Sequence, residues 1–150
     1  MKGFTIRVYM LIEHNGKLLL SDEIIAGNRY VKLPGGGLEW GEGLRDAALR
    51  EAREELRQEV EIIDHHYTTD FFLESRFLPG QQVIAVYFIA QLAHQHQIEA
   101  VSALTGDHRL ANGEESFRWV DASTQLLEEL SFETDRRAVK KWLDQRTVHQ

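Results

Sequence analysis

The sequence predicts a fold of the α+β class, formed by one domain that spans residues 1–150. Residues 43–58 contain no proline and are rich in Ala, Leu, Arg and Glu, so we expect a helix there. Residues 4–33 and 59–93 instead contain runs of alternating or continuous apolar residues, which predict strands. Apolar residues at helical spacing return only near the carboxyl end, which indicates further helices after the strands.

The composition limits the classes of protein to which the chain can belong. Its 150 residues are 43% hydrophobic, which is enough for one core. No cysteine is present, which excludes disulfides and thiol catalysis. No basic region followed by a long apolar run opens the chain, so we expect a cytoplasmic protein with no membrane partner. A net charge of -7 without a Lys/Arg-rich run argues against a nucleic-acid polymer as partner, although a nucleotide is compatible with it.

The first part of the chain predicts a β-hairpin and a third strand. Residues 4–12 have alternating apolar residues, and Asn15-Gly16 is a turn signal that leads into the apolar residues 17–20. We expect residues 22–29 to form a loop. Residues 30–33 then form a short strand, which Pro34 and three glycines end just before the predicted helix.

The segment after the helix predicts more strands. Residues 59–63 alternate, and residues 67–77 form a longer segment rich in aromatics before a turn at residues 78–81. Residues 83–93 are the most apolar run, so we expect a central strand antiparallel to its predecessor. The histidines around these strands are expected to face solvent and not to bind metal: His65, His66, His94 and His96.

The last third of the sequence predicts a loop, a strand and helices. Residues 99–113 are mixed and contain two glycines, which is typical of a loop. Glu114 and Glu115 then open a strand at residues 117–120. Residues 126–130 and 135–143 have apolar residues at helical spacing, and we expect them to cover one side of the sheet.

Three glutamates of the predicted helix share one face. Glu51, Glu54 and Glu55 stand at positions i, i+3 and i+4. Like charges at this spacing repel, so the cluster indicates either a solvated acidic face or a bound cation. Carboxylates select Mg²⁺, Mn²⁺ or Ca²⁺, and a few of them with open water positions are typical of a Mg²⁺ site that substrate phosphate completes.

The helical positions of these acids favour a metal over a solvated face. Glu51 and Glu55 lie at the border of an apolar stripe, and a border acid is partly desolvated. Arg50 lies on the far side and can reach Glu54 one turn later. The stripe consists of Leu44, Ala48, Ala52 and Leu56, with Leu49 beside it.

The stretch from Gly36 to Gln58 resembles the Nudix box, G-x5-E-x7-R-E-U-x-E-E-x-G-U with U aliphatic, which is the signature of the Nudix hydrolase family. The residues on its fixed positions are Gly36, Glu42, Arg50, Glu51, Ala52, Glu54 and Glu55. The chain departs from the box at Arg57, where the family has glycine, and at Gln58, where it has an aliphatic residue. Because the glycine normally supplies a left-handed C-cap, Arg57 implies either that the helix runs on or that a non-glycine residue takes a strained exit.

The resemblance implies a fold, an activity and a cofactor. The fold is a Nudix-type mixed β-sheet between the box helix on one side and the carboxyl-terminal helix on the other. The activity is that of a pyrophosphohydrolase, which cleaves a small nucleoside diphosphate linked to another group with Mg²⁺-activated water. Mn²⁺ is the expected substitute for Mg²⁺. The expected metal ligands are Glu51, Glu55, Glu54 and the Gly35 carbonyl.

The resemblance also implies catalytic residues, namely Glu54, Glu51 and Arg50. The general base stays open among Glu54, Glu51 and a later acid. Similar proteins often place such an acid where Glu114 and Glu115 lie, but charges that keep a strand edge soluble explain these two residues equally well.

Other classes of protein are compatible with parts of the sequence. A Nudix-like nucleotide sensor or partner-binding module with little turnover is the main alternative, but that role does not require every acid of the box. A Ca²⁺-binding structural domain would need an EF-hand loop, and a dinucleotide-binding loop would need a third glycine where Trp40 stands. The sequence leaves the nucleotide unassigned, and it leaves both a monomer and a homodimer open.

Overall fold

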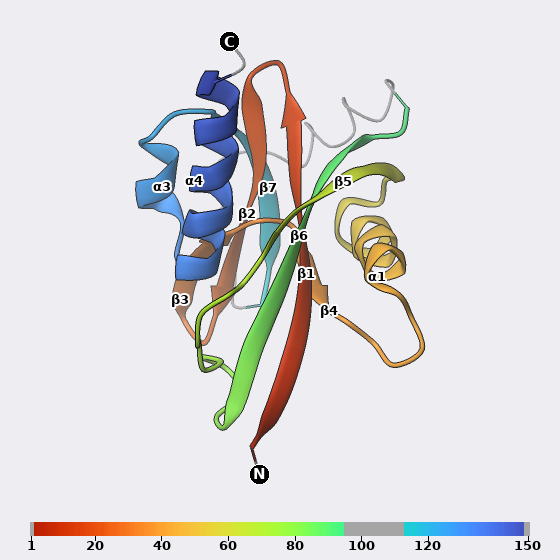
Figure 1. The fold of residues 1–150 in the computed structure, drawn as a ribbon, viewed down its shortest axis with the longest axis vertical. Coiled ribbons are helices and arrows are strands. Elements are labelled where there is room, and N and C mark those ends of the chain that lie inside the picture. Colours follow the sequence, from red (N-terminus) through yellow and green to blue (C-terminus); the bar gives the residue numbers. More distant parts are fainter. Residues whose placement is uncertain (1, 95–112, 149–150) are drawn as a thin grey trace.

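A mixed β-sheet with helices on both sides forms the protein, in a computed structural model that describes residues 2–94 and 113–148 (Figure 1). The strands are β1 (Gly3–His14), β2 (Lys17–Ile25), β3 (Asn28–Lys32), β4 (Gly35–Gly37), β5 (Val60–Thr68), β6 (Gln81–Leu92) and β7 (Glu115–Asp121). The helices are α1 (Leu44–Glu51), the π-helical turn η1 (Ala52–Leu56), α3 (Leu126–Glu129) and α4 (Glu133–Val148). The architecture is therefore the α+β arrangement that the sequence predicts.

The strand order places β1 at the centre of the sheet. Within the described residues the order is β3-β2-β1-β6-β5, with β4 beside β1 and β7 beside β2. β1 and β6 run parallel, from Gly3 opposite Gln81 to Ile12 opposite Ala90. β5 pairs antiparallel with β6, which confirms residues 83–93 as a central strand. The Asn15-Gly16 hairpin is also confirmed, with His14 opposite Lys17.

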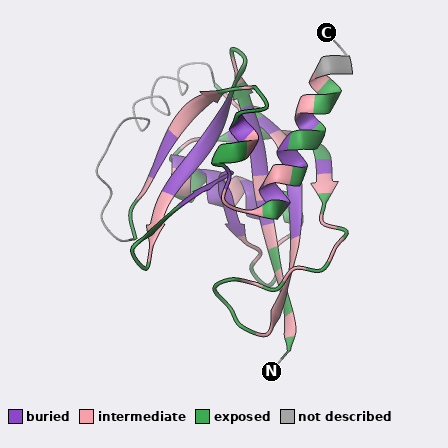
Figure 2. Cartoon of the chain, turned by 90° about the vertical axis from the view of Figure 1, so that its left-hand side faces the viewer, coloured by how far each residue is buried: buried purple, intermediate pink, exposed green. Residues whose placement is uncertain are grey.

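Two apolar cores lie on opposite faces of the sheet. Val8 and Met10 of β1 face α1 and η1, and Leu11 faces α4, because successive side chains of a strand point to opposite faces. Figure 2 shows that burial is concentrated in the strands and on the inner sides of the helices. The core beside α1 includes Ala48, Ala52, Leu56, Val86 and Phe88, and the core beside α4 includes Leu20, Tyr87, Val139 and Trp142.

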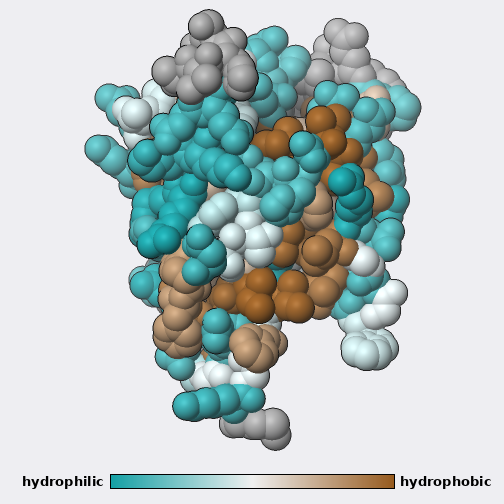
Figure 3. Space-filling model, in the orientation of Figure 1, coloured by the Kyte–Doolittle hydropathy of each residue, from teal (hydrophilic) through white to brown (hydrophobic). Residues whose placement is uncertain are grey.

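The surface is mixed in character. On the face shown in Figure 3, apolar side chains gather near the centre and hydrophilic side chains surround them. In the part of the chain that the structure describes, no helix is both long and apolar enough to cross a membrane.

The prediction of a loop at residues 22–29 is wrong. β2 continues to Ile25 and pairs there with Asn28 of β3, so only Ala26 and Gly27 form the turn. Both turn residues have positive φ, 51° and 82°, as a type I′ hairpin turn requires. Asn-Gly or Asp-Gly is the usual signal for such a turn, and Ala-Gly does not carry it.

Asp22 misled the prediction because it has the polar character of a loop residue. Its side chain is nevertheless buried. There the Arg118 Nε donates to Oδ2 at 2.6 Å and the Arg29 Nη2 donates to Oδ1 at 2.9 Å. A buried charge is tolerated when it is paired in this way.

The box helix ends one residue before Arg57, which decides between the two alternatives for this position. Arg57 has φ 56° and ψ 33°, the left-handed conformation, and its N–H donates to the Arg53 carbonyl at 3.1 Å. A non-glycine residue therefore takes the strained exit. The preceding turn, η1, is π-helical.

The prediction that His66 faces solvent is wrong. His66 is only 5% exposed, and its Nε2 donates to the Ala138 carbonyl of α4 at 2.8 Å. His65 is exposed on the opposite face, as successive strand residues should be. His94 is exposed as predicted, whereas His96 and most of the predicted loop at residues 99–113 lie outside the described residues.

Candidate active site

The glycines of β4 bring the acids of the box helix close to the backbone of the sheet. Gly35 has φ 147°, and a Cβ there would lie 2.0 Å from the Val8 carbonyl oxygen. A Cβ at Gly36 would lie 2.4 Å from Oε1 of Glu51. Only glycine fits at Gly35, and a side chain at Gly36 would require Glu51 to move, so Glu51 rests directly on the short strand.

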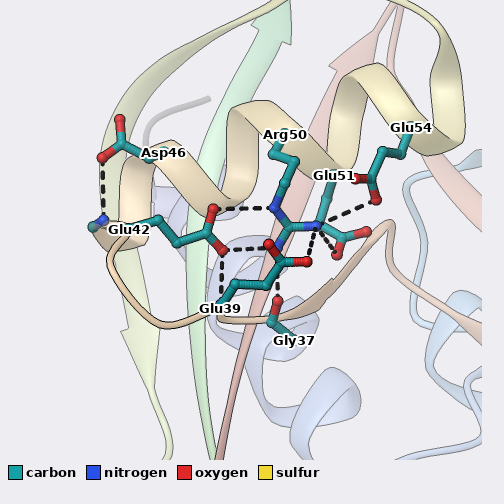
Figure 4. Close-up of polar contacts among 8 residues, drawn as sticks. Gly37, Glu39, Glu42, Asp46, Arg50, Glu51 and Glu54 are labelled. Carbon is teal, nitrogen blue, oxygen red and sulfur yellow. Dashed lines mark hydrogen bonds and ion pairs between the residues drawn. The ribbon is translucent and has the colours of Figure 1, made fainter.

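Arg50 connects the loop before α1 to the acids on the helix (Figure 4). Its Nη1 donates to Glu51 Oε1 at 3.0 Å and to Glu54 Oε2 at 3.2 Å. The contact with Glu54 is the one that the sequence predicts. Its Nη2 also donates to the Gly37 carbonyl at 2.8 Å. One guanidinium thus fixes β4, the helix and two carboxylates relative to each other.

Glu42 is the strongest partner of Arg50, and sequence reasoning missed this pairing. Arg50 Nη2 donates to Glu42 Oε1 at 2.7 Å and Nε donates to Oε2 at 3.0 Å, the two-pronged geometry that makes Arg–carboxylate pairs strong. The hydrogen bonds to Glu42 raise the pKa of Arg50 well above its usual range. Glu42 also accepts from the Glu39 N–H at 2.8 Å. This box glutamate therefore holds the loop and Arg50 in place.

Glu51 and Glu55 are the two box acids that turn toward the sheet. Glu51 is only 8% exposed, and Glu55 Oε2 accepts from the Gly35 N–H at 3.1 Å. Burial raises the pKa of Glu55, and the nearby charges of Glu115 and Glu51 raise it further. The Lys32 ammonium and the Gly35 N–H offset only part of this rise. Glu55 is thus a carboxylate whose negative charge lacks sufficient compensation.

Glu115 joins this group, which answers a question that the sequence leaves open. The Ser21 hydroxyl donates to Glu115 Oε2 at 2.8 Å, and the Lys32 Nζ lies 3.6 Å from the same oxygen. Burial raises the pKa of Glu115, although Lys32 and Ser21 oppose the rise. Glu114, its neighbour, is exposed. Pairing of β7 with β2, in which Glu115 is opposite Glu23, turns Glu115 toward the helix acids.

Glu54 and Gly35 occupy different places from the Glu51–Glu55 pair. The Glu54 side chain is 57% exposed and points to Arg50 (Figure 4). Gly35 presents its N–H, not its carbonyl, to Glu55. Metal ligation by the Gly35 carbonyl and by Glu54 stays a prediction.

The donor set suits a hard divalent cation. Carboxylate oxygens of Glu51 and Glu55 share a partly buried site, and a cation would offset both the burial and the repulsion that raise the pKa of Glu55. Among the described residues, no three His, Cys, Asp or Glu side chains stand ready to hold a metal ion. Existing hydrogen bonds from Arg50 and the Gly35 N–H hold the carboxylates of Glu51 and Glu55 where they are.

These carboxylates open into a large cavity of about 1040 Å³. Its walls come from β1, β4, the helix acids, the segment 73–79 and the start of α4. Its described lining residues include seven acids, Glu23, Glu51, Glu55, Glu74, Glu115, Glu133 and Asp135, but only four Arg or Lys residues. An anionic substrate therefore needs added positive charge to bind here.

The sequence matches the family model of the NUDIX domain over residues 1–143, with the box on the helix that carries these acids. The chain belongs to the Nudix family. The resemblance inferred from residues 36–58 is thus confirmed for nearly the whole chain. A search of curated protein sequences found no significant match.

Solved structures share the Nudix fold of this chain. A NUDIX hydrolase from Nitrosomonas europaea has a TM-score of 0.69 at 19% identity, covering 93% of this chain and 88% of that one. The E. coli dihydroneopterin triphosphate pyrophosphohydrolase has a TM-score of 0.67 at 17% identity, covering 96% and 99%. An ADP-ribose pyrophosphatase from Streptococcus suis has a TM-score of 0.61 at 18% identity, covering 95% and 91%. These identities support a shared fold and leave the substrate unassigned.

Proposed function

We propose that this Nudix protein is a Mg²⁺-dependent pyrophosphohydrolase that cleaves a nucleoside diphosphate linked to another group. The observation that carries the proposal is the placement of Glu51 and Glu55, two partly buried acids, at the wall of a cavity of about 1040 Å³. A cavity of this size can enclose a nucleotide-sized ligand. The names of two similar structures, an ADP-ribose pyrophosphatase and a dihydroneopterin triphosphate pyrophosphohydrolase, agree with a phosphoanhydride as the bond cleaved.

The metal would be held by Glu51 and Glu55, with Glu54 and the Gly35 carbonyl as further ligands. When bound, Mg²⁺ supplies charge neutralisation for the diphosphate and lowers the pKa of an attacking water, and Mn²⁺ can substitute. Net negative charge in the cavity supports this requirement, because the diphosphate would otherwise be repelled.

The side chains of the protein position the reactants and accept the proton. Arg50 fixes Glu51 and Glu54 and ties both to the loop through Glu42. A water oxygen attacks one phosphorus, the bond from that phosphorus to the bridging oxygen breaks, and the bridging oxygen leaves with the other phosphate group. One proton of the water passes to a carboxylate. Glu115 joins Glu51 and Glu54 as a candidate for that base. Its contacts with Ser21 and Lys32 are both made by Oε2 and do not use Oε1.

The test is a screen of nucleoside diphosphate derivatives with and without Mg²⁺, with identification of the products. We expect at least one compound to give a nucleoside monophosphate only when Mg²⁺ is present. Saturable binding of the same compounds without metal-stimulated cleavage would instead favour the sensor or partner-binding role.

A further inference from the structure

Arg7 places a cation in the cavity, although it lies outside the Nudix box in the sequence. It belongs to the face of β1 that carries Thr5, Arg7 and Tyr9, all of which line the cavity. Val8 and Met10, on the opposite face of the strand, are buried in the core beside α1. The side chain of Arg7 therefore cannot join that core and is directed to the cavity by the strand alternation.

The guanidinium of Arg7 is anchored through one nitrogen. Its Nε donates to the Tyr9 hydroxyl at 2.7 Å, and the Tyr9 ring stacks on Tyr87 with centroids 5.3 Å apart. The Tyr87 hydroxyl in turn donates to Asp135, which is buried at the start of α4. A rigid aromatic support thus fixes the orientation of Arg7.

The two terminal nitrogens of Arg7 are not engaged by any described residue. Nη1 lies close to Gly37, which has no side chain to cover it; a Cβ there would be 3.7 Å away. In the described residues no carboxylate forms an ion pair with Arg7. Burial lowers the pKa of Arg7, but Tyr9 and, to a smaller extent, Glu51 and Glu55 raise it above its usual value. An anchored guanidinium with free terminal donors has the geometry that binds a carboxylate or phosphate through two hydrogen bonds.

The other described cations of the cavity are committed or at its rim. Lys32 pairs with Glu23 at 3.1 Å and with Glu115 at 3.6 Å. Arg136 pairs with Glu133 and donates to the Leu130 carbonyl at 2.7 Å. Arg76 is exposed and lies over the Tyr30 ring. Arg7 is the partly buried cation that the fold leaves available for a ligand.

We propose that Arg7 binds the diphosphate group of the substrate through Nη1 and Nη2, in the same cavity as the metal-binding acids. This inference rests on the proposed function, because the ligand is taken to be a diphosphate. It assigns a substrate-binding residue outside the box. It also accounts for how a cavity with more acids than bases can hold an anion.

The experiment measures binding without turnover. The full-length chain is titrated calorimetrically, in the presence of Mg²⁺, with α,β-methylene nucleoside diphosphates and with the matching nucleoside monophosphates. The variants are Arg7→Met, which removes the charged guanidinium, and Arg7→Lys, which keeps a positive charge without the two terminal nitrogens. The matched control is Arg45→Met, an exposed arginine on α1 whose guanidinium lies over the Phe88 ring.

We expect Arg7→Met to weaken binding of the diphosphate analogue roughly 10- to 100-fold, the loss typical of a charged hydrogen-bonding pair. Arg7→Lys should lose less, and Arg45→Met should bind like the wild type. Monophosphate binding should weaken less than diphosphate binding, because a merely structural role of Arg7 would weaken both equally. Thermal melts identify any variant that fails to fold. If Arg7→Met does not fold, the binding measured for Arg7→Lys tests the role of Arg7.

Two failures are distinguishable. If the wild type binds the analogue and folded Arg7 variants bind it within twofold, the role of Arg7 is wrong while the proposed function stands. If the wild type binds none of the diphosphate analogues, the proposed function fails, and the role of Arg7 fails with it.

Discussion

The Glu51 carboxylate lies against the backbone of Gly36, so closely that a methyl group on Gly36 would come within 2.4 Å of Oε1. The atom in the way is the end of a flexible side chain, which can move. Gly36→Ala should therefore fold but displace Glu51 from its place beside the sheet. We expect at least roughly tenfold loss of Mg²⁺-dependent activity, since small misplacements of catalytic groups are costly.

Gly35→Ala is the matched comparison for this prediction. There the added carbon would meet the Val8 carbonyl at 2.0 Å, a backbone atom that cannot move aside, and φ is 147°. Strain and overpacking should destabilise the fold by about 2–4 kcal/mol. Thermal melts and activity assays separate the two variants. Equal losses of stability in both variants would show that Glu51 cannot move aside to admit a methyl group at Gly36.

Arg57→Gly should stabilise the protein. Arg57 has the left-handed conformation, which costs a non-glycine residue roughly 1–2 kcal/mol. Glycine removes this cost but also raises the conformational entropy of the unfolded chain, which offsets part of the stabilisation. We expect a rise in melting temperature of up to about 2–4 °C. Arg53→Gly, in the middle of η1, should instead lose about 1 kcal/mol. A comparable loss in Arg57→Gly would mean that the helix continues through this position in solution.

His66 should make stability fall in mild acid. Burial lowers the pKa of His66 below its usual value, although the hydrogen bond to the Ala138 carbonyl opposes this shift. The neutral ring is therefore favoured in the folded state. Its contribution is fully present above about pH 6.5, the pKa of an unperturbed histidine, and is lost as pH falls below that value.

The measurement compares unfolding free energies at pH 7.5 and pH 5.5 for His66→Gln and His65→Gln. His65 is the matched control because it is exposed and bonds only at the surface, to Thr68 at 2.8 Å. We expect the change in unfolding free energy between the two pH values to be the same in His65→Gln as in the wild type. His66→Gln should lack the part of that change that favours unfolding in acid. Glu55, whose raised pKa acts in the opposite direction, is present in all three proteins and does not affect the comparison. If the unfolding free energy of His66→Gln depends on pH as that of the wild type does, His66 is not a source of this dependence.

The residues that local spacing connects could be predicted from the sequence. Glu51, Glu54 and Glu55 are neighbours on one helix face, and the reach from Arg50 to Glu54 follows from the same geometry. The Nudix box predicted the family, and the family in turn predicted a sheet between two helices. The apolar alternation at residues 4–12 likewise predicted a strand, which β1 confirms.

Contacts that depend on strand pairing could not be predicted in this way. Glu115 reaches Ser21 across 94 positions of sequence because β7 lies beside β2. His66 is buried because α4 covers its side of β5. Neither pairing leaves a signal in local composition. The same holds for Arg7, whose place in the cavity depends on β4 lying beside β1.

The helix face that carries Glu55 is proposed to be the catalytic metal site. Glu55→Gln keeps the shape of the side chain and an oxygen that can accept from the Gly35 N–H, but it removes the charge. Because burial and the charges of Glu115 and Glu51 all disfavour a charged Glu55 in the metal-free protein, the variant should melt at or slightly above the wild-type temperature. Its control is Glu59→Gln, an exposed acid outside the box that pairs with Arg53.

The decisive measurement pairs the metal-free melting temperature with Mg²⁺-dependent hydrolysis of a nucleoside diphosphate derivative for both variants. We predict that Glu55→Gln keeps its fold and loses most turnover, on the order of 100-fold or more, as expected when a preorganised charge is removed from an active site. Glu59→Gln should retain wild-type turnover, with a change in stability of about 0–1 kcal/mol. Wild-type, metal-dependent turnover in Glu55→Gln would contradict the assignment of this face as the catalytic metal site.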